Sequence, residues 1–345
     1  MTRSKPSALD LALVDAVGKL GFTISPTQLE RWRTQRWLRR PADWTDSATG
    51  KIRDKIVHRA ACLAHVSTSG RSISWIGWTF WAIDDTPETA SRLRAAVVEA
   101  LERPLRRAGL DIRTIPEGDS YDAFAARQDM AAGMLKNRRR CPERDFDGSL
   151  RAGAAEAEFD LPPSRTVANM FHKALMDPGA RMVVGGVADV TFEELMDAWE
   201  SASPDNAELV DRMRTAHCEA ALTGVDIFAH SPMAGGMRGL VRAVQEADDQ
   251  RLCAAVRACT KGSGILGILL IQRVPHEPEI LRTLMADEMW EQWVRVGGFV
   301  PVLGMGGEAA IAVSVVQHLL IPGWAEGLAR YQTLMETLLG QTADR

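Results

Sequence analysis

One short segment, residues 21–41 (GFTISPTQLERWRTQRWLRRP), constrains the fold of this chain more than any other stretch. Ser25 is a favourable N-cap residue, and Pro26 suits the first helical position, where a missing N–H costs nothing. Gln28 lies three residues after the cap and completes a capping box. These signals agree on one starting point, and they predict a basic helix over residues 26–38.

The residues around that helix predict a helix-turn-helix. Ile24 and Leu29 occupy the two positions of a hydrophobic staple, and helical spacing places Leu29 and Trp32 on one apolar face. The preceding segment, residues 9–21, has helical periodicity and ends at a glycine suited to a tight turn. A helix, a short turn and a capped basic helix form the arrangement that places one helix in the major groove of DNA.

Charge is divided unevenly along the chain, which holds 41 Lys and Arg against 45 Asp and Glu. Residues 1–60 contain 12 basic and 6 acidic residues, a net charge of +6, and the remainder carries a net charge of −10. A basic module on an acidic body is what attraction to DNA phosphates requires. The alternative is an ordinary pair of amphipathic helices whose arginines only form a solvated face.

Two stretches, SPTQLERW (residues 25–32) and WLRRP (residues 37–41), resemble the winged helix-turn-helix of MerR-type transcription regulators. In that family a capped helix carries a Leu and then an aromatic residue, and a Gly-Leu-Leu turn leads into a wing that contains Pro. The resemblance covers about residues 8–110 and implies that residues 42–53 form the wing. It also implies that the long helix expected at residues 87–108 pairs two subunits, so that a homodimer contacts two half-sites about one helical turn apart.

The resemblance implies which side chains contact double-stranded DNA. The residues expected near the bases are Thr27, Gln28 and Arg31. The residues expected near the phosphates are Arg33, Arg39, Arg40, Lys51 and Arg53, and Arg36 is expected to bind DNA as well. Two positions depart from the family pattern, since Arg36 replaces the usual turn glycine and Glu30 replaces a common arginine. Arg36 therefore needs either a positive φ or a different turn.

The complete chain is expected to be mainly α, in three parts: residues 1–110 as the DNA-binding domain, 111–163 as a joint, and 164–345 as a large helical domain. Helical patterns lie at residues 52–68, 72–83, 87–108, 164–177, 191–201, 205–223, 236–260, 278–296, 308–320 and 323–339. Trp75, Trp78 and Trp81 recur every three residues, a stripe typical of a packed core. The apolar runs MVVGGV and ILGILLI have β character but are too isolated to form a doubly wound sheet.

No motif in the chain supports a catalytic residue, a metal site or a cofactor. Residues 262–267 match GxGxxG, but a helix-like segment precedes them and a β-like run follows, which inverts the context of a dinucleotide site. The histidines lack the paired spacing of metal ligands, and no GxSxG elbow is present. The five cysteines form no CxxC pair, which favours reduced thiols and a cytoplasmic location.

The C-terminal part is expected to sense a ligand or to form oligomers. Its methionines, with Trp290, Trp293 and Trp324, are residues that can line an apolar pocket for a small-molecule effector. Residues 299–324 are apolar, but Glu308 and several glycines and prolines favour a buried helix over a membrane span. The expected function is sequence-specific DNA binding as a transcriptional regulator. A protein–protein interaction module and an enzyme with an appended helix-turn-helix remain alternatives.

Overall fold

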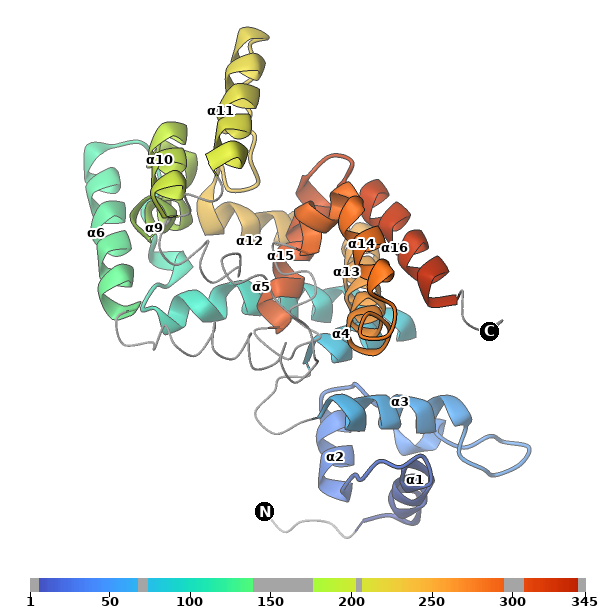
Figure 1. The fold of residues 1–345 in the computed structure, drawn as a ribbon. Helices are drawn as coiled ribbons and strands as arrows, with labels where there is room; N and C mark the ends of the chain where they lie inside the picture. Colours follow the sequence, from blue (N-terminus) through green and yellow to red (C-terminus); the bar gives the residue numbers. More distant parts are fainter. Residues whose placement is uncertain (1–5, 68–73, 139–175, 203–206, 295–306, 341–345) are drawn as a thin grey trace.

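The computed structural model describes residues 6–67, 74–138, 176–202, 207–294 and 307–340. These residues are mostly helical, which confirms the mainly α fold class (Figure 1). The α-helices of the N-terminal half are α1 (Ala8–Gly18), α2 (Pro26–Thr34), α3 (Asp54–Val66), α4 (Ser74–Asp84), α5 (Thr89–Arg107) and α6 (Tyr121–Arg138). Those of the C-terminal half are α9 (Met176–Gly185), α10 (Phe192–Ala202), α11 (Ala207–Leu222), α12 (Gly236–Glu246), α13 (Asp249–Ile268), α14 (Pro278–Ala286), α15 (Gly307–Leu320) and α16 (Trp324–Gly340).

Helices α1, α2 and α3 form an N-terminal unit whose local signals act as expected. Ser25 caps α2, and both halves of its capping box with Gln28 are present. Helix α2 ends at Thr34 rather than at residue 38, because the amide of Trp37 bonds the carbonyl oxygen of Trp32 (2.9 Å). The amide of Arg36 bonds the carbonyl oxygen of Arg33 (2.9 Å), which completes a Schellman motif.

The segment expected to form a wing is a loop rather than a pair of strands. In residues 44–53 the described chain has one isolated antiparallel bridge, between Thr45 and Ile52. The amide of Asp46 bonds the carbonyl oxygen of Lys51 (2.9 Å), and Gly50 closes the turn with a φ of 64°. The fold is therefore an α1–α2 pair with a short hairpin-like loop, and the winged form is not established.

The N-terminal unit rests on α4. Gly77 lets the two parts approach closely, because a Cβ atom built there would lie 1.9 Å from the indole Nε1 of Trp37. Asp84, the last residue of α4, binds Arg59 of α3 through both oxygens (2.7 and 2.9 Å). The same carboxylate accepts two bonds from Arg39 (3.1 and 2.9 Å). The buried residues of the unit and of the body belong to one continuous hydrophobic core.

The body is organised around α5 and α13. Helix α13 packs against α4, α5, α15 and α16, and α5 also packs against α12 and α15. The guanidinium of Arg94 fixes α5 to the α12–α13 turn through the carbonyl oxygens of Val244 and Ala247 and the carboxylate of Asp249. The helix that the family resemblance assigns to subunit pairing thus buries its apolar face within its own chain.

The peripheral helices α6, α9, α10 and α11 lie beside the body (Figure 1). Helix α6 falls in the segment expected to be a joint, and it packs against α9. Arg127 of α6 and Asp189 form a buried bidentate ion pair, with both oxygen–nitrogen distances at 2.7 Å. Helices α10 and α11 have a second, smaller core around Phe192, Met196 and Val210.

Several expectations for the C-terminal part are wrong in detail. The expected helix 236–260 is two helices, because Asp248 caps α13 by accepting the amides of Gln250 and Arg251 (2.9 and 3.1 Å). The segment 278–296 is α14 followed by a π-turn at Trp290–Val294. Both β-like runs lie largely in helices, within α9 and at the end of α13. The expected helix 164–177 lies almost entirely outside the described residues.

The tryptophans expected near a pocket are core residues instead. Trp290, Trp293 and Trp324 are buried, and the indole N–H of Trp293 donates to Ser314 (3.2 Å). The GxGxxG match lies within α13, where Gly262 makes room for the Trp293 ring. The stripe on α4 is also core at Trp75 and Trp78, as expected.

One helical segment, residues 249–273, has the length and apolar composition to cross a membrane. In the structure 56% of its most apolar window is buried inside the protein, against the helices that surround α13. The shorter apolar helix α15 agrees with the helix expected at residues 308–320. We interpret residues 249–273 as the central core helix of the body.

Candidate nucleic-acid interface

The outward face of α2 carries two of the three residues expected to read bases. Thr27 and Arg31 lie one helical turn apart and are exposed, while Leu29 and Trp32 on the opposite face are fully buried. The carboxyl end of α2 contacts the body, because the indole N–H of Trp81 donates to the Gln35 carbonyl oxygen (3.1 Å). The amino end of α2 therefore points away from the body (Figure 1), as base reading requires.

Two of the expected contact residues are engaged inside the N-terminal unit. The Gln28 Oε1 atom accepts bonds from the Ser25 amide (2.8 Å) and hydroxyl (3.0 Å). Arg33 forms an ion pair with Asp10 of α1, and its guanidinium lies 5.6 Å from the centre of the Trp44 ring. Both side chains therefore hold the unit together.

The carboxyl group of Asp10 stays ionised and so keeps its ion pair with Arg33. Burial raises the pKa of its carboxyl group, but hydrogen bonds from Ser7 and the nearby Arg33 guanidinium outweigh burial and hold the pKa below its ordinary value. A carboxylate that stays ionised keeps the positive charge of Arg33 compensated. Arg33 is consequently a weak candidate for a phosphate contact.

The arginines after α2 gather around a hollow of about 360 Å³ between the N-terminal unit and the α4–α5 junction. Arg36, Arg39 and Arg40 line it together with Arg92 of α5. Arg92 was not singled out by sequence, because nothing local links it to the arginines some 50 residues earlier in the chain. The hollow brings four guanidinium-bearing residues to one place, and such groups recognise phosphate.

Acidic side chains compensate only part of that charge. Asp84 pairs with Arg39, and Glu88 pairs with Arg92 (3.2 Å). Asp43 also lines the hollow and has no basic partner in the described part of the chain. Arg36 and Arg40 are exposed, and no hydrogen bond or ion pair joins their side chains to another described residue. They are the arginines of this cluster that are open to an incoming anion.

Of the two alternatives expected at Arg36, the structure has the positive φ, at 58°. A left-handed backbone at a residue other than glycine costs roughly 1 kcal/mol. Glycine would satisfy the Schellman motif without that strain. An exposed arginine at a strained position is consistent with a role for its side chain beyond folding.

We predict that Arg36→Gly raises the free energy of unfolding by about 1 kcal/mol relative to Arg36→Ala, because only glycine relieves the strain. Both variants remove the same charge, so both lower the salt dependence of DNA binding by the same amount, about one unit of slope. Urea denaturation and DNA titration of the two variants check this pair of results. Equal stability of the two variants would exclude strain at Arg36.

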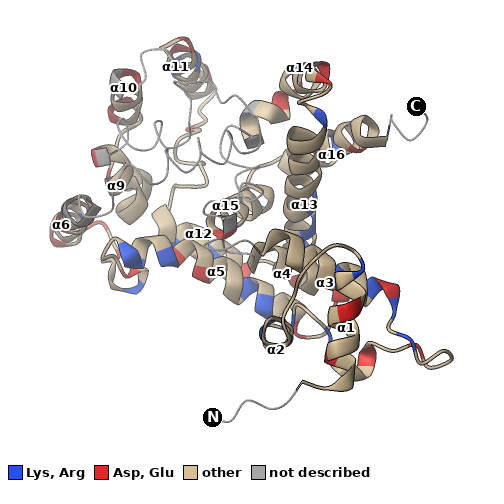
Figure 2. Ribbon diagram, turned by 60° about the horizontal axis from the view of Figure 1, so that its bottom comes forward, with Lys and Arg blue, Asp and Glu red and all other residues tan. Residues whose placement is uncertain are grey.

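Lys51 and Arg53 do not lie beside the α2 face. Arg53 donates from Nε to the Thr45 carbonyl oxygen (3.1 Å) at the base of the loop, whereas Lys51 is exposed. In both ribbon views the loop projects from the side of the unit opposite α2, with α1 between them (Figure 2). The structure therefore groups Arg31, Arg36 and Arg40 with α2 and separates the loop residues from them.

The described residues contain no group of three or more His, Cys, Asp or Glu side chains placed to hold a metal ion. Cys62, Cys218, Cys253 and Cys259 are free thiols, and complete burial raises the pKa of Cys259. Comparison with known proteins gives no match: no protein-family model, no curated protein and no solved structure is significantly similar to the chain. The functional argument therefore rests on the residues themselves.

Proposed function

We propose that this protein is a cytoplasmic transcriptional regulator that binds double-stranded DNA through α2 and the arginines that follow it. The observation that carries the proposal is the pattern of charge pairing. Arg33 and Arg39 are held by carboxylates, whereas Arg31, Arg36 and Arg40 are exposed without an acidic partner among the described residues. Unpaired arginines beside a capped helix are suited to phosphate contacts and to bidentate contacts with guanine.

The proposed division of roles follows from position along α2. Thr27 in the first turn and Arg31 in the last turn lie on the exposed face of α2, so they would face the base edges in the major groove. Arg36 and Arg40 lie beyond the carboxyl end of α2, where the hollow would receive a backbone phosphate. The resemblance to MerR-type regulators supports the same division, with the loop of residues 44–53 contributing less than a family wing.

This division predicts different effects for two single substitutions. Arg31→Ala should reduce the preference for an enriched sequence over random duplex, because each lost base contact costs about 1–3 kcal/mol of discrimination. Arg40→Ala should weaken binding to both duplexes equally and lower the salt slope by about one. Selection from a random DNA library with the wild-type chain supplies the enriched sequence. If both variants lost the same affinity for the enriched and the random duplex, the assignment of Arg31 to bases and Arg40 to phosphates would be contradicted.

We also propose that the protein acts as a homodimer, since two half-sites are the usual target of such units. The apolar face of α5 is buried within the chain, so pairing would use another surface. The alternative function, a protein–protein interaction module, would show no affinity for DNA at low salt. An appended enzyme remains without a candidate catalytic residue in the described residues.

A further inference from the structure

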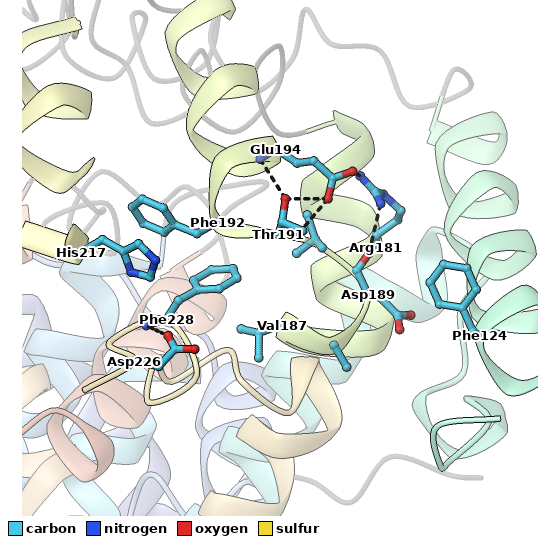
Figure 3. Close-up of a pocket in the computed structure, with 12 residues that line it drawn as sticks. Phe124, Arg181, Val187, Asp189, Thr191, Phe192, Glu194, His217, Asp226 and Phe228 are labelled. Carbon is cyan, nitrogen blue, oxygen red and sulfur yellow. Dashed lines mark hydrogen bonds and ion pairs between the residues drawn. The ribbon is translucent and has the colours of Figure 1, made fainter. Parts of the chain in front are cut away.

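A second hollow lies far from α2, among the peripheral helices. Its volume is about 510 Å³, and it lies between η3 (Gly186–Ala188), α10, α11 and the loop that follows α11, with α6 on one side (Figure 3). Three phenylalanines line it: Phe124, Phe192 and Phe228. A hollow of this size with aromatic walls can hold a small organic molecule.

The aromatic wall has a defined geometry. The His217 ring stacks on Phe192, with ring centres 4.1 Å apart and planes inclined by 20°. Phe228 meets Phe192 edge to face at 5.7 Å. Figure 3 shows these three rings together on one side of the hollow, next to the Asp226 carboxylate. The wall thus combines π faces with a negative charge.

The acidic groups of the hollow differ in how far they are compensated. Arg127 binds Asp189, and Arg181 binds Glu194 (2.9 Å). Asp226 accepts the amides of Phe228 and Ala229 through Oδ1 (both 2.9 Å), and no Lys or Arg in the described residues pairs with it. These amide hydrogen bonds, that of Ala229 foremost, hold the pKa of Asp226 below its ordinary value. At neutral pH the hollow therefore presents an ionised carboxylate that no Lys or Arg of the described residues neutralises, with His217 and His230 as its basic neighbours.

We propose that this hollow binds a small organic cation, an amine attached to a planar or aromatic group. The ammonium group would pair with Asp226, and the ring of Phe228, which is less buried than Phe192, would attract both the cation and its planar part. The carboxylate would repel an anionic ligand, and a neutral ligand would make no ionic contact with it. The inference is independent of DNA binding, and in a regulator it would identify the effector site.

Three matched probes test this site on the full-length chain by isothermal titration calorimetry. They are 2-phenylethylamine, its neutral counterpart 2-phenylethanol, and the anion phenylacetate. We expect the amine to bind at least tenfold more tightly than the alcohol and phenylacetate to show no binding. Equal affinities for the three probes, or no binding of the amine at millimolar concentration, would overturn the proposal.

Three substitutions test whether the amine binds in this hollow. Asp226→Asn keeps an oxygen for the two amides and removes the charge, so it should lower amine affinity at least tenfold and leave alcohol affinity unchanged. Phe228→Leu should lower amine affinity about 2- to 30-fold through the lost cation–π contact. Glu219→Gln, an equal change of charge at an exposed position of α11, should have no effect. Full amine affinity in Asp226→Asn would contradict the assignment.

Discussion

Asp84→Ala should lower the free energy of unfolding by about 3 kcal/mol, because it leaves a largely buried arginine without its counter-ion. The side chains of Asp84 and Arg59 are each only 11% exposed, and Arg39 bonds the same carboxylate. One carboxylate thus joins α4 to α3 and to the segment after α2. Urea denaturation of the full-length chain measures the loss.

The pH dependence of this effect has a definite sign. Burial raises the pKa of Asp84, but hydrogen bonds from Arg59 and Arg39 outweigh burial and bring the pKa below its ordinary value of 3.8. The stabilisation is therefore complete above pH 3.8 and is lost as the pH falls through the lower folded-state pKa. The difference in the free energy of unfolding between the wild type and Asp84→Ala should therefore become smaller over that acidic range.

Asp15→Ala is the matched control for Asp84→Ala. Asp15 forms an ion pair with Lys19 in the same N-terminal unit (2.8 Å), but the two side chains are 68% and 74% exposed. A solvent-exposed pair of this kind contributes about 0.5 kcal/mol or less. If the two substitutions destabilised the protein equally, Asp84 would not be the residue that fixes the unit to α4.

The triple variant Arg31→Ala, Arg36→Ala and Arg40→Ala should lose nearly all affinity for random-sequence duplex DNA. Each phosphate contact contributes about 0.9 to the slope of log K against log salt, so removal of three cations lowers the slope by about 2.7 if each neutralises one phosphate in non-specific binding. The loss is largest at low salt, where counter-ion release contributes most. Fluorescence anisotropy over a series of salt concentrations measures both quantities.

A second triple variant controls for net charge. Arg107, Arg212 and Arg282 are exposed arginines of the body, and their substitution by alanine changes the formal charge by the same amount. This variant should bind DNA with nearly the affinity and slope of the wild type. Equal losses in the two triple variants would mean that overall charge, rather than the α2 surface, determines binding.

The local features of the N-terminal unit could be predicted from sequence because their causes are local. The cap at Ser25 and the positive φ at Arg36 depend on residues within one or two helical turns, and both agree with the structure. The cap of α13 at Asp248 is an equally local signal. The break between α12 and α13 was nevertheless missed, because the apolar pattern continues on both sides of it. The end of α2 was placed too late, because the helix was extended to residue 38 although the turn expected at Arg36 implies an earlier end.

The features that depend on contacts between distant residues could not be predicted. Asp84 contacts Arg59 and Arg39 only because α4 packs on the N-terminal unit. No local sequence pattern predicts a contact between residues so far apart in the chain. The run after Gly264 has β character by composition, yet it is helical because α13 is enclosed by other helices. Burial against the surrounding helices therefore outweighed the intrinsic β preference of this segment.

The same limit applies to the candidate site. Sequence grouped nine residues as one DNA-binding set, whereas the structure divides them among the α2 face, the interior of the unit, the hollow beside α5 and a separate loop. Arg33 and Gln28 were selected by position in a motif, and the structure gives them partners. Arg92 joined the set only through the packing of α5.

The measurement that tests the central claim most directly is the binding of the full-length wild-type chain to random-sequence duplex DNA as a function of salt. If Arg31, Arg36 and Arg40 each neutralise one phosphate of a random-sequence duplex, the wild-type slope of log K against log salt is about −2.7 or steeper, and the slope of the first triple variant is shallower by about 2.7. Absence of binding at low salt, or a slope that the first triple variant leaves unchanged, would contradict DNA binding through α2.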